Sequence, residues 1–177
     1  MRPSAEVHDA LARLVSYPSP GFAEAAEEWV AQVAAGCPAA GAHLEEFLRW
    51  VRGCGDGEIE ELFTRTFDVS QEAALEIGWH AYGENYTRGA FLVRMRQLLR
   101  EQGVAESGEL PDHLSHVLPV LARLEPAAAK LLAEEVVSPS VKRIAVALAA
   151  GAHPYEGVLD AVLAVLKLHY AQPEGCC

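Results

Sequence analysis

The sequence predicts an all-α fold, a single domain of roughly eight to ten helices, and three observations lead to this prediction. Apolar residues recur three, four and seven positions apart along most of the chain, which places them on one face of a helix. Hydrophobic residues make up 51% of the 177 residues, with many alanines and leucines and few β-branched runs. No segment alternates apolar and polar residues for long enough to predict a strand.

Glycine and proline clusters divide the first third of the chain into four expected helices. The apolar stretches with helical spacing lie at 7–15, 22–35, 44–51 and 59–67. The breaks between them lie at 17–21, 36–38 and 53–57. Because proline and glycine interrupt a helix, we expect each stretch to form a separate element.

A fifth helix is expected to carry three aromatic side chains on one face. Residues 68–70 are a good capping segment, and Trp79, Tyr82 and Tyr86 follow them at helical spacing. Gly83 is the position that could interrupt this helix. Aromatic residues at this spacing are typical of a core, but here we expect the three rings to line a groove between helices.

The second half of the chain is predicted to form further helices. One begins near Thr87, and another opens at Pro111 after the polar break at 103–108. The last three are expected at 126–136, 139–150 and 154–170. Residues 1–171 then form one helical domain, and residues 172–177 form a disordered tail.

The segment Glu109-Leu110-Pro111-Asp112-His113 has the composition of a helix start. Proline in the first turn and a carboxylate beside free backbone N–H groups are a normal way to open a helix. This interpretation explains every residue except His113. It also predicts that Asp112 and His113 lie at the surface, where conservative substitutions change stability by about 0.5 kcal/mol.

Charge and composition exclude several classes of function. The net charge of −11 and the pI near 5.0 would repel the phosphates of a nucleic acid. Residues 1–9 do not read as an export signal, and the longest apolar stretch, 144–152, is much shorter than the roughly 20 residues of a membrane span. Neither a zinc site nor a disulfide framework is indicated by the cysteines, Cys37, Cys54, Cys176 and Cys177. We therefore expect a cytoplasmic protein that does not insert into a membrane.

Few residues point to catalysis. The chain has no Gly-rich phosphate loop, no His-Glu-x-x-His sequence and no nucleophile elbow. Asp112, His113 and His116 are close enough in sequence to hold a metal, so a small metal-binding hydrolase is one alternative. A structural subunit of a larger complex is another. His80, next to Trp79, is more typical of a hydrogen-bonded core residue than of a catalytic base.

Acidic residues surround the predicted Trp79 helix. They are Asp68, Glu72, Glu76 and Glu84. Carboxylates in this arrangement either keep the surface soluble or receive a basic peptide. The arginines of the following segment, which begin at Arg88, are most simply a solvated face.

An ordered set of short segments resembles the NarJ family of nitrate reductase assembly chaperones, and more broadly the TorD/DmsD family of molybdoenzyme-specific chaperones. The segments are Ser16-Tyr17-Pro18, Thr66-Phe67-Asp68-Val69-Ser70, His80-Ala81-Tyr82-Gly83-Glu84, Arg88-Gly89, Glu109-Leu110-Pro111-Asp112-His113-Leu114 and Ala152-His153-Pro154-Tyr155. At His113 the chain is closer to the TorD and DmsD form, because NarJ proteins often carry an aromatic residue there. The client is therefore either nitrate reductase or a sister molybdoenzyme.

The resemblance implies a TorD-like, non-enzymatic chaperone. Such a protein binds the N-terminal segment of the apo catalytic (alpha) subunit and holds it for insertion of the molybdenum cofactor. It keeps no cofactor stably, could meet cofactor-delivery proteins, and is a monomer or a dimer. The residues expected to bind the client peptide are Asp68, Glu76, Trp79, His80, Tyr82, Tyr86, Arg88, Glu109, Pro111, Asp112 and His113.

Overall fold

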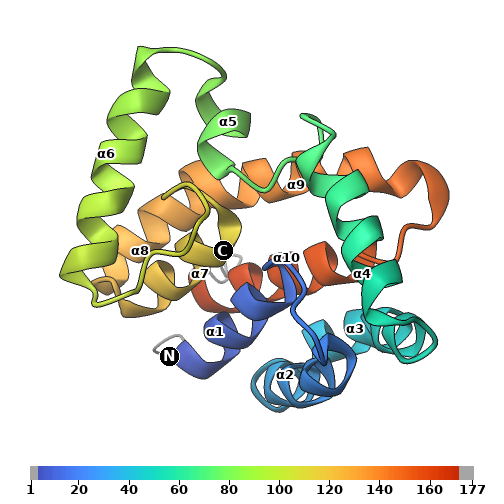
Figure 1. The fold of residues 1–177 in the computed structure, drawn as a ribbon. Coiled ribbons are helices and arrows are strands. Elements are labelled where there is room, and N and C mark those ends of the chain that lie inside the picture. The colour runs from blue at the N-terminus through green and yellow to red at the C-terminus, as the bar shows by residue number, and fades with distance from the viewer. Residues whose placement is uncertain (1–3, 172–177) are drawn as a thin grey trace.

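A computed structural model describes residues 4–171, and the regular secondary structure within that range is helical, which confirms the all-α prediction (Figure 1). The predicted disordered tail at 172–177 lies outside the described residues. The α-helices are α1 (Ala5–Leu14), α2 (Phe22–Gly36), α3 (Pro38–Arg52), α4 (Asp56–Phe63), α5 (Ile77–Tyr82), α6 (Tyr86–Glu101), α7 (Leu114–Arg123), α8 (Pro126–Leu132), α9 (Ser138–Leu148) and α10 (Glu156–Tyr170). None of the helices in this range is both long and apolar enough to cross a membrane.

Helix α10 lies in the middle of the bundle and packs against α3 and α9, while α1 packs against α2 and α7 (Figure 1). The inner face of α10, which includes Val158, Val162 and Val165, is fully buried. Helices α2 and α3 approach closely because position 41 is glycine: a Cβ there would lie 2.5 Å from the Cβ of Ala34. Burial of each large aliphatic side chain contributes about 1.5–3 kcal/mol, so this core supplies most of the stability.

A cluster of aromatic rings joins the N-terminal helices to α10. Tyr155 is fully buried, and its ring centroid lies 5.0 Å from that of Phe47 and 5.1 Å from that of Phe67. Thr66 lies beside this cluster and its hydroxyl is 2.8 Å from Nε2 of His153. The cluster therefore fixes the position of the π-helical segment η1 (Thr64–Asp68), which continues α4.

The two helices predicted at 126–136 and 139–150 run into each other instead of being separate. The π-helical segment η2 (Ala133–Val137) joins α8 to α9, and the N–H of Ser138 donates to the carbonyl of Ala133. Pro139 has no N–H to donate, and proline inside a regular α-helix also clashes with the preceding turn. A wider turn just before Pro139 lets the chain continue as a helix.

The structure corrects the predicted aromatic helix. Residues 71–76 are not helical, and α5 begins only at Ile77. Gly83, with a φ of 68°, ends α5, and a new helix begins after Asn85, whose side chain accepts hydrogen bonds from two backbone N–H groups of α6. Tyr86 therefore belongs to a different helix from Trp79 and Tyr82.

The predicted helix start at Pro111 is also wrong by three residues. Helix α7 begins at Leu114, and His113 is its N-cap. Pro111 and Asp112 lie in the turn before it, and both are buried. Their environment is set by a contact with the segment before α5, which is distant in sequence.

Candidate functional site

Two segments that are distant in sequence, 75–77 and 112–114, pair side by side next to the candidate site. The N–H of Ile77 donates to the carbonyl of Asp112 over 2.9 Å, and the N–H of Leu114 donates to the carbonyl of Leu75 over 2.9 Å. Glu76 and His113 form an isolated antiparallel bridge between them. This pairing brings the Glu109–His113 segment against the first turn of α5.

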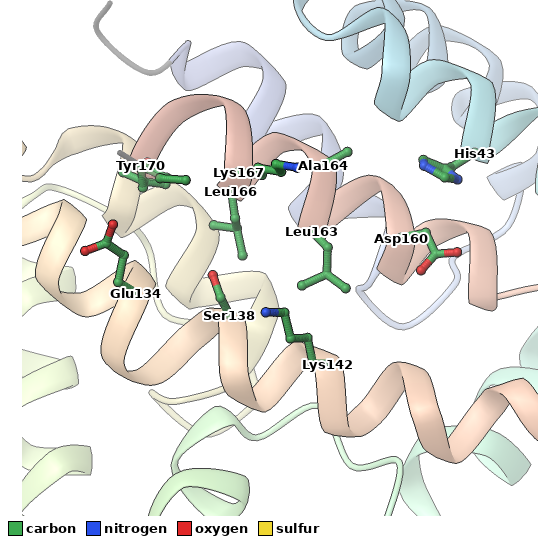
Figure 2. Close-up of a pocket in the computed structure, with 11 residues that line it drawn as sticks. His43, Glu134, Ser138, Lys142, Asp160, Leu163, Ala164, Leu166, Lys167 and Tyr170 are labelled. Carbon is green, nitrogen blue, oxygen red and sulfur yellow. The ribbon is translucent and has the colours of Figure 1, made fainter. Parts of the chain in front are cut away.

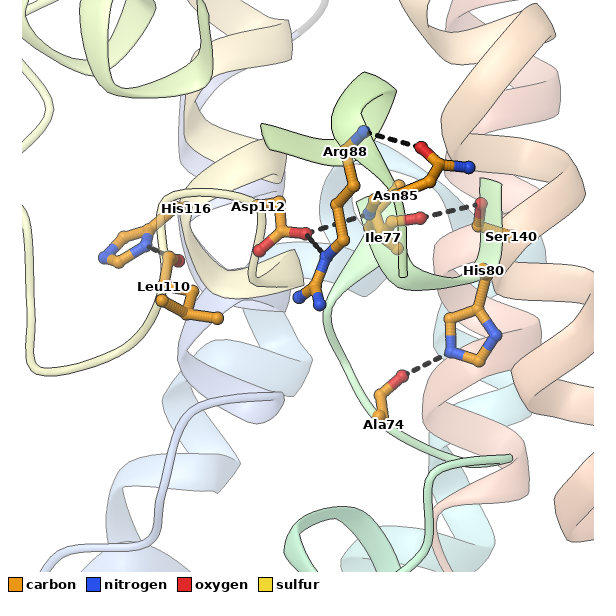
Figure 3. Close-up of polar contacts among 10 residues, drawn as sticks. Ala74, Ile77, His80, Asn85, Arg88, Leu110, Asp112, His116 and Ser140 are labelled. Atoms are coloured by element: carbon orange, nitrogen blue, oxygen red, sulfur yellow. Dashed lines mark hydrogen bonds and ion pairs between the residues drawn. The ribbon is translucent and has the colours of Figure 1, made fainter. Parts of the chain in front are cut away.

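Asp112 is the centre of the polar contacts in this region (Figure 3). Its carboxylate is fully buried, and Oδ2 accepts hydrogen bonds from the N–H of Gly78 at 3.1 Å and from Nε of Arg88 at 3.4 Å. Burial raises the pKa of Asp112, and the Arg88 guanidinium partly offsets this effect. The carboxylate is therefore held by partners from α5 and α6.

Contacts with Trp79 and with Asp112 hold the guanidinium of Arg88 in place. Its guanidinium carbon lies 5.7 Å from the ring centroid of Trp79, in a cation–π arrangement, and its side chain is only 19% exposed. Asn85 holds the backbone of this turn, because its Oδ1 accepts from the N–H groups of Thr87 and Arg88. The charge of Arg88 is thus directed at Asp112 and not at solvent.

A pocket of about 480 Å³ opens beside this ion pair. It is lined by Phe67, Asp68, Ser70, Gln71, Ala74, Glu76, Trp79, Glu84, Arg88 and Leu110. Asp68 and Glu84 are exposed at the pocket, whereas Glu76 is half-buried. Burial, and then the nearby carboxylates of Asp112 and Glu109, raise the pKa of Glu76. We refer to this hollow as the Trp79 pocket.

The Trp79 pocket is electrostatically suited to a cation. Three carboxylates line it, and its one guanidinium is already paired with the buried Asp112. The indole of Trp79 and the side chain of Leu110 supply apolar walls. Such a combination can hold a basic side chain by charge and its aliphatic stem by contact.

A second hollow of about 520 Å³ lies on the other side of Trp79 and includes His80 and Arg143. Nε2–H of His80 donates to the carbonyl of Ala74 over 2.6 Å, because a carbonyl can only accept (Figure 3). Arg143 donates to the carbonyl of His80, and burial lowers the pKa of the imidazole. His80 therefore anchors the segment before α5 as a half-buried, hydrogen-bonded residue.

The structure gathers only some of the predicted site residues. Asp68, Glu76, Trp79 and Arg88 line the Trp79 pocket, with Asp112 behind it. The remaining predicted residues lie elsewhere: His80 lines the second hollow, Tyr82 packs on Phe91 between α6 and α8, Tyr86 is 94% exposed, Glu109 is exposed, and Pro111 and His113 are buried. The expectation that Trp79, Tyr82 and Tyr86 line one groove is therefore wrong.

Sequence reasoning missed Gly78 and Leu110 as site residues. A Cβ at position 78 would lie 2.6 Å from Oδ2 of Asp112 and 2.8 Å from a ring carbon of Phe91, so only glycine fits. Glycine inside an apolar helical stretch destabilises the helix, so its presence indicates that another part of the chain packs closely against the backbone there. Gly78 is such a glycine, and this sequence feature could have identified it.

Asp112, His113 and His116, the expected ligands of a metal-binding hydrolase, each bind a different group of the protein. His116 donates from Nδ1 to the carbonyl of Leu110 and accepts at Nε2 from the N–H of Ser107, so both of its ring nitrogens are engaged. Nδ1 of His113 accepts from the N–H of Ser115, while Asp112 faces Arg88. In the part of the chain that the structure describes, no three His, Cys, Asp or Glu residues are grouped so that they could hold a metal ion.

The fold and the site together define an all-helical protein with an acidic pocket that a tryptophan lines. The sequence matches the family described as nitrate reductase delta subunit over residues 20–158, and the chain belongs to this family. Membership supports a general role as a chaperone in molybdoenzyme maturation, and it confirms the resemblance found in the sequence. A search of curated proteins finds no match to the chain.

Proposed function

We propose that this protein is a cytoplasmic maturation chaperone that binds the N-terminal segment of the apo catalytic subunit of a molybdoenzyme, with respiratory nitrate reductase as the client. It holds that subunit during insertion of the molybdenum cofactor and assembly of the complex, and it keeps no cofactor stably itself. Its partners are this subunit and, at the moment of insertion, the proteins that deliver the cofactor.

The observation that carries this proposal is the composition of the Trp79 pocket. Asp68, Glu76 and Glu84 place three carboxylates around an indole, and Arg88 is neutralised by Asp112. A basic residue near the N-terminus of a client peptide would be attracted to these carboxylates, and its apolar neighbours would pack on Trp79 and Leu110. Membership of the nitrate reductase delta subunit family supports the same class of client.

The direct test is calorimetry with a synthetic peptide that copies the N-terminus of the catalytic subunit of a respiratory nitrate reductase. We expect a dissociation constant in the micromolar range or tighter, which corresponds to about −8 kcal/mol or better. Binding should weaken as salt is added, because the pocket attracts the peptide by charge. A titration without heat, and without competition by the intact client, would contradict the proposal.

A pair of charge-neutral variants locates the binding site. Asp68→Asn combined with Glu84→Gln removes two exposed carboxylates from the pocket, and we expect binding at least about tenfold weaker, or 1.4 kcal/mol. Glu45→Gln combined with Glu46→Gln is the matched control, since it removes two exposed carboxylates from α3. Equal weakening by both pairs would indicate attraction by net charge alone and not by this pocket.

A further inference from the structure

A pocket lies away from the Trp79 pocket, in a groove between α9 and α10. It has a volume of about 570 Å³. Figure 2 shows Glu134, Ser138 and Lys142 along one wall, and Asp160, Leu163 and Lys167 along the other. The side chains of Leu163, Ala164 and Leu166 give the groove a mainly apolar lining. A volume of this size is typical of a small-molecule site, which commonly measures about 300–1,000 Å³.

The lysines of the chain gather around this groove. The sequence contains three lysines, at positions 130, 142 and 167, and two of them line the groove. The third, Lys130, lies 3.4 Å from Glu134, which is also part of the lining. Arginine supplies the other cations of the protein, so the choice of lysine here is specific to one place in the fold. Lysine acts as a compact point charge for an anionic head group.

The groove contains positive charge that is not paired within the part of the protein that the structure describes. Lys142 and Lys167 have no carboxylate within 4.0 Å among the described residues, whereas Glu134 is paired with Lys130. In Figure 2 the ammonium group of Lys142 points toward Ser138 and away from Asp160. Of the two carboxylates in the lining, Glu134 is therefore paired from outside the groove, and Asp160 is the other. The charged side chains of the lining are thus balanced, whereas the whole chain has a net charge of −11.

We propose that the groove between α9 and α10 binds a small organic anion. The ligand class is a carboxylate or phosphate head group attached to an aliphatic or aromatic body. Lys142 and Lys167 hold the head group, the hydroxyl of Ser138 is available as a hydrogen-bond donor, and the apolar body packs on Leu163 and Ala164. This site is separate from the Trp79 pocket, with which it shares no lining residue.

The test uses a pair of fluorescent probes that differ in a single charged group. The anion 8-anilinonaphthalene-1-sulfonate should bind the folded protein saturably, and at least about tenfold more tightly than the uncharged N-phenyl-1-naphthylamine. In a Lys142→Gln, Lys167→Gln double variant this preference should disappear, while binding of the uncharged probe stays the same. Octanoate and octyl phosphate should displace the anionic probe and octanol should not, and the more effective of the two identifies the preferred head group.

Arg100→Gln is the matched control, because it removes one exposed positive charge from α6. Its preference for the anionic probe should equal that of the wild type, and circular dichroism should verify that all variants are folded. The client peptide should bind the double lysine variant with unchanged affinity, which separates this proposal from that for the Trp79 pocket. The proposal is overturned if the anionic probe does not bind saturably, if both probes bind equally, or if the double variant keeps the preference.

Discussion

The carboxylate of Asp112 lies directly on the backbone of Gly78, with Oδ2 3.1 Å from the glycine nitrogen. The two residues are 34 positions apart in the sequence. Because Asp112 also pairs with Arg88, the contact connects the turn before α7 with α5 and α6. The wall of the Trp79 pocket therefore depends on a position that has no side chain.

Replacing Gly78 with alanine should destabilise the protein by about 1–3 kcal/mol, as expected for overpacking of a filled site. The new Cβ would lie 2.6 Å from Oδ2 of Asp112 and 2.8 Å from a ring carbon of Phe91, so both side chains must move. The free energy of unfolding, measured in urea, checks this expectation.

Gly89→Ala is the matched control for this substitution. Gly89 lies within α6, and nothing would lie within 4 Å of a Cβ there. Alanine favours a helix over glycine by about 0.5–1 kcal/mol, so this variant should be more stable than the wild type. If both variants were stabilised, the close approach at Gly78 would not exist in solution.

Asp112→Asn should destabilise the protein by about 1–3 kcal/mol. This is larger than the effect of about 0.5 kcal/mol that the sequence predicts for a surface position. The carboxylate is fully buried, and the neutral amide would lose the charge-assisted bond to Arg88. A double-mutant cycle with Arg88→Gln should give a coupling energy of about 0.5–3 kcal/mol.

Asp9→Asn provides a comparison within the same protein. Asp9 forms an ion pair with Arg123 at 2.7 Å, but about a third of each side chain is exposed. Exposed ion pairs contribute about 0.2–1 kcal/mol, so this substitution should cost less than Asp112→Asn. An equal or greater cost at Asp9 would show that the carboxylate of Asp112 is not buried in solution.

The errors of sequence interpretation have physical causes. The helical periodicity of α2 and α10 is a local property, and their ranges were predicted to within two residues. Pro111 and Asp112, by contrast, form a local pattern that is typical of a helix start. Their actual positions depend on hydrogen bonds between this segment and residues 75–77. Likewise, the aromatic spacing from Trp79 to Tyr86 continues through Gly83, where the chain turns. Contacts across the fold decided the positions of Pro111 and Asp112, whereas at Gly83 the local glycine signal was correct and the aromatic spacing was misleading.

Stability should fall as the pH decreases from about 6.5 to about 4, partly because of His8. Its Nδ1–H donates to the carbonyl of Ser4, its Nε2 accepts from the hydroxyl of Tyr170, and its ring stacks on His169. Burial lowers the pKa of His8 to about 4. The unfolded chain therefore takes up a proton at higher pH than the folded one, and acid favours unfolding by up to about 3 kcal/mol.

Urea unfolding of His8→Gln at several pH values checks this contribution. The glutamine has no charge to gain, so the decrease in stability between pH 6.5 and 4 should be smaller than in the wild type. His113 should retain part of the dependence, because burial lowers its pKa to about 4 as well. The exposed His43→Gln variant is the control. If His8→Gln and the wild type lost stability in parallel, His8 would not be buried in its neutral form.

Trp79 should report peptide binding, whereas Tyr86 should be irrelevant to it. In a Trp29→Phe, Trp50→Phe background Trp79 is the remaining tryptophan, and it lines the pocket beside Arg88. Its emission should change when the client peptide fills the pocket, and Trp79→Ala should weaken binding at least about tenfold, as for an aromatic contact at the centre of an interface.

Tyr86→Ala is the decisive comparison, because the sequence alone placed both aromatic residues on one binding face. Tyr86 is 94% exposed at the first position of α6 and does not line the pocket, so its removal should leave the peptide affinity unchanged. Urea unfolding must accompany both truncations, since a large aromatic lost from a core costs about 3–5 kcal/mol. A folded Tyr86→Ala variant that loses as much affinity as Trp79→Ala would move the binding surface from the Trp79 pocket to the outer face of α6.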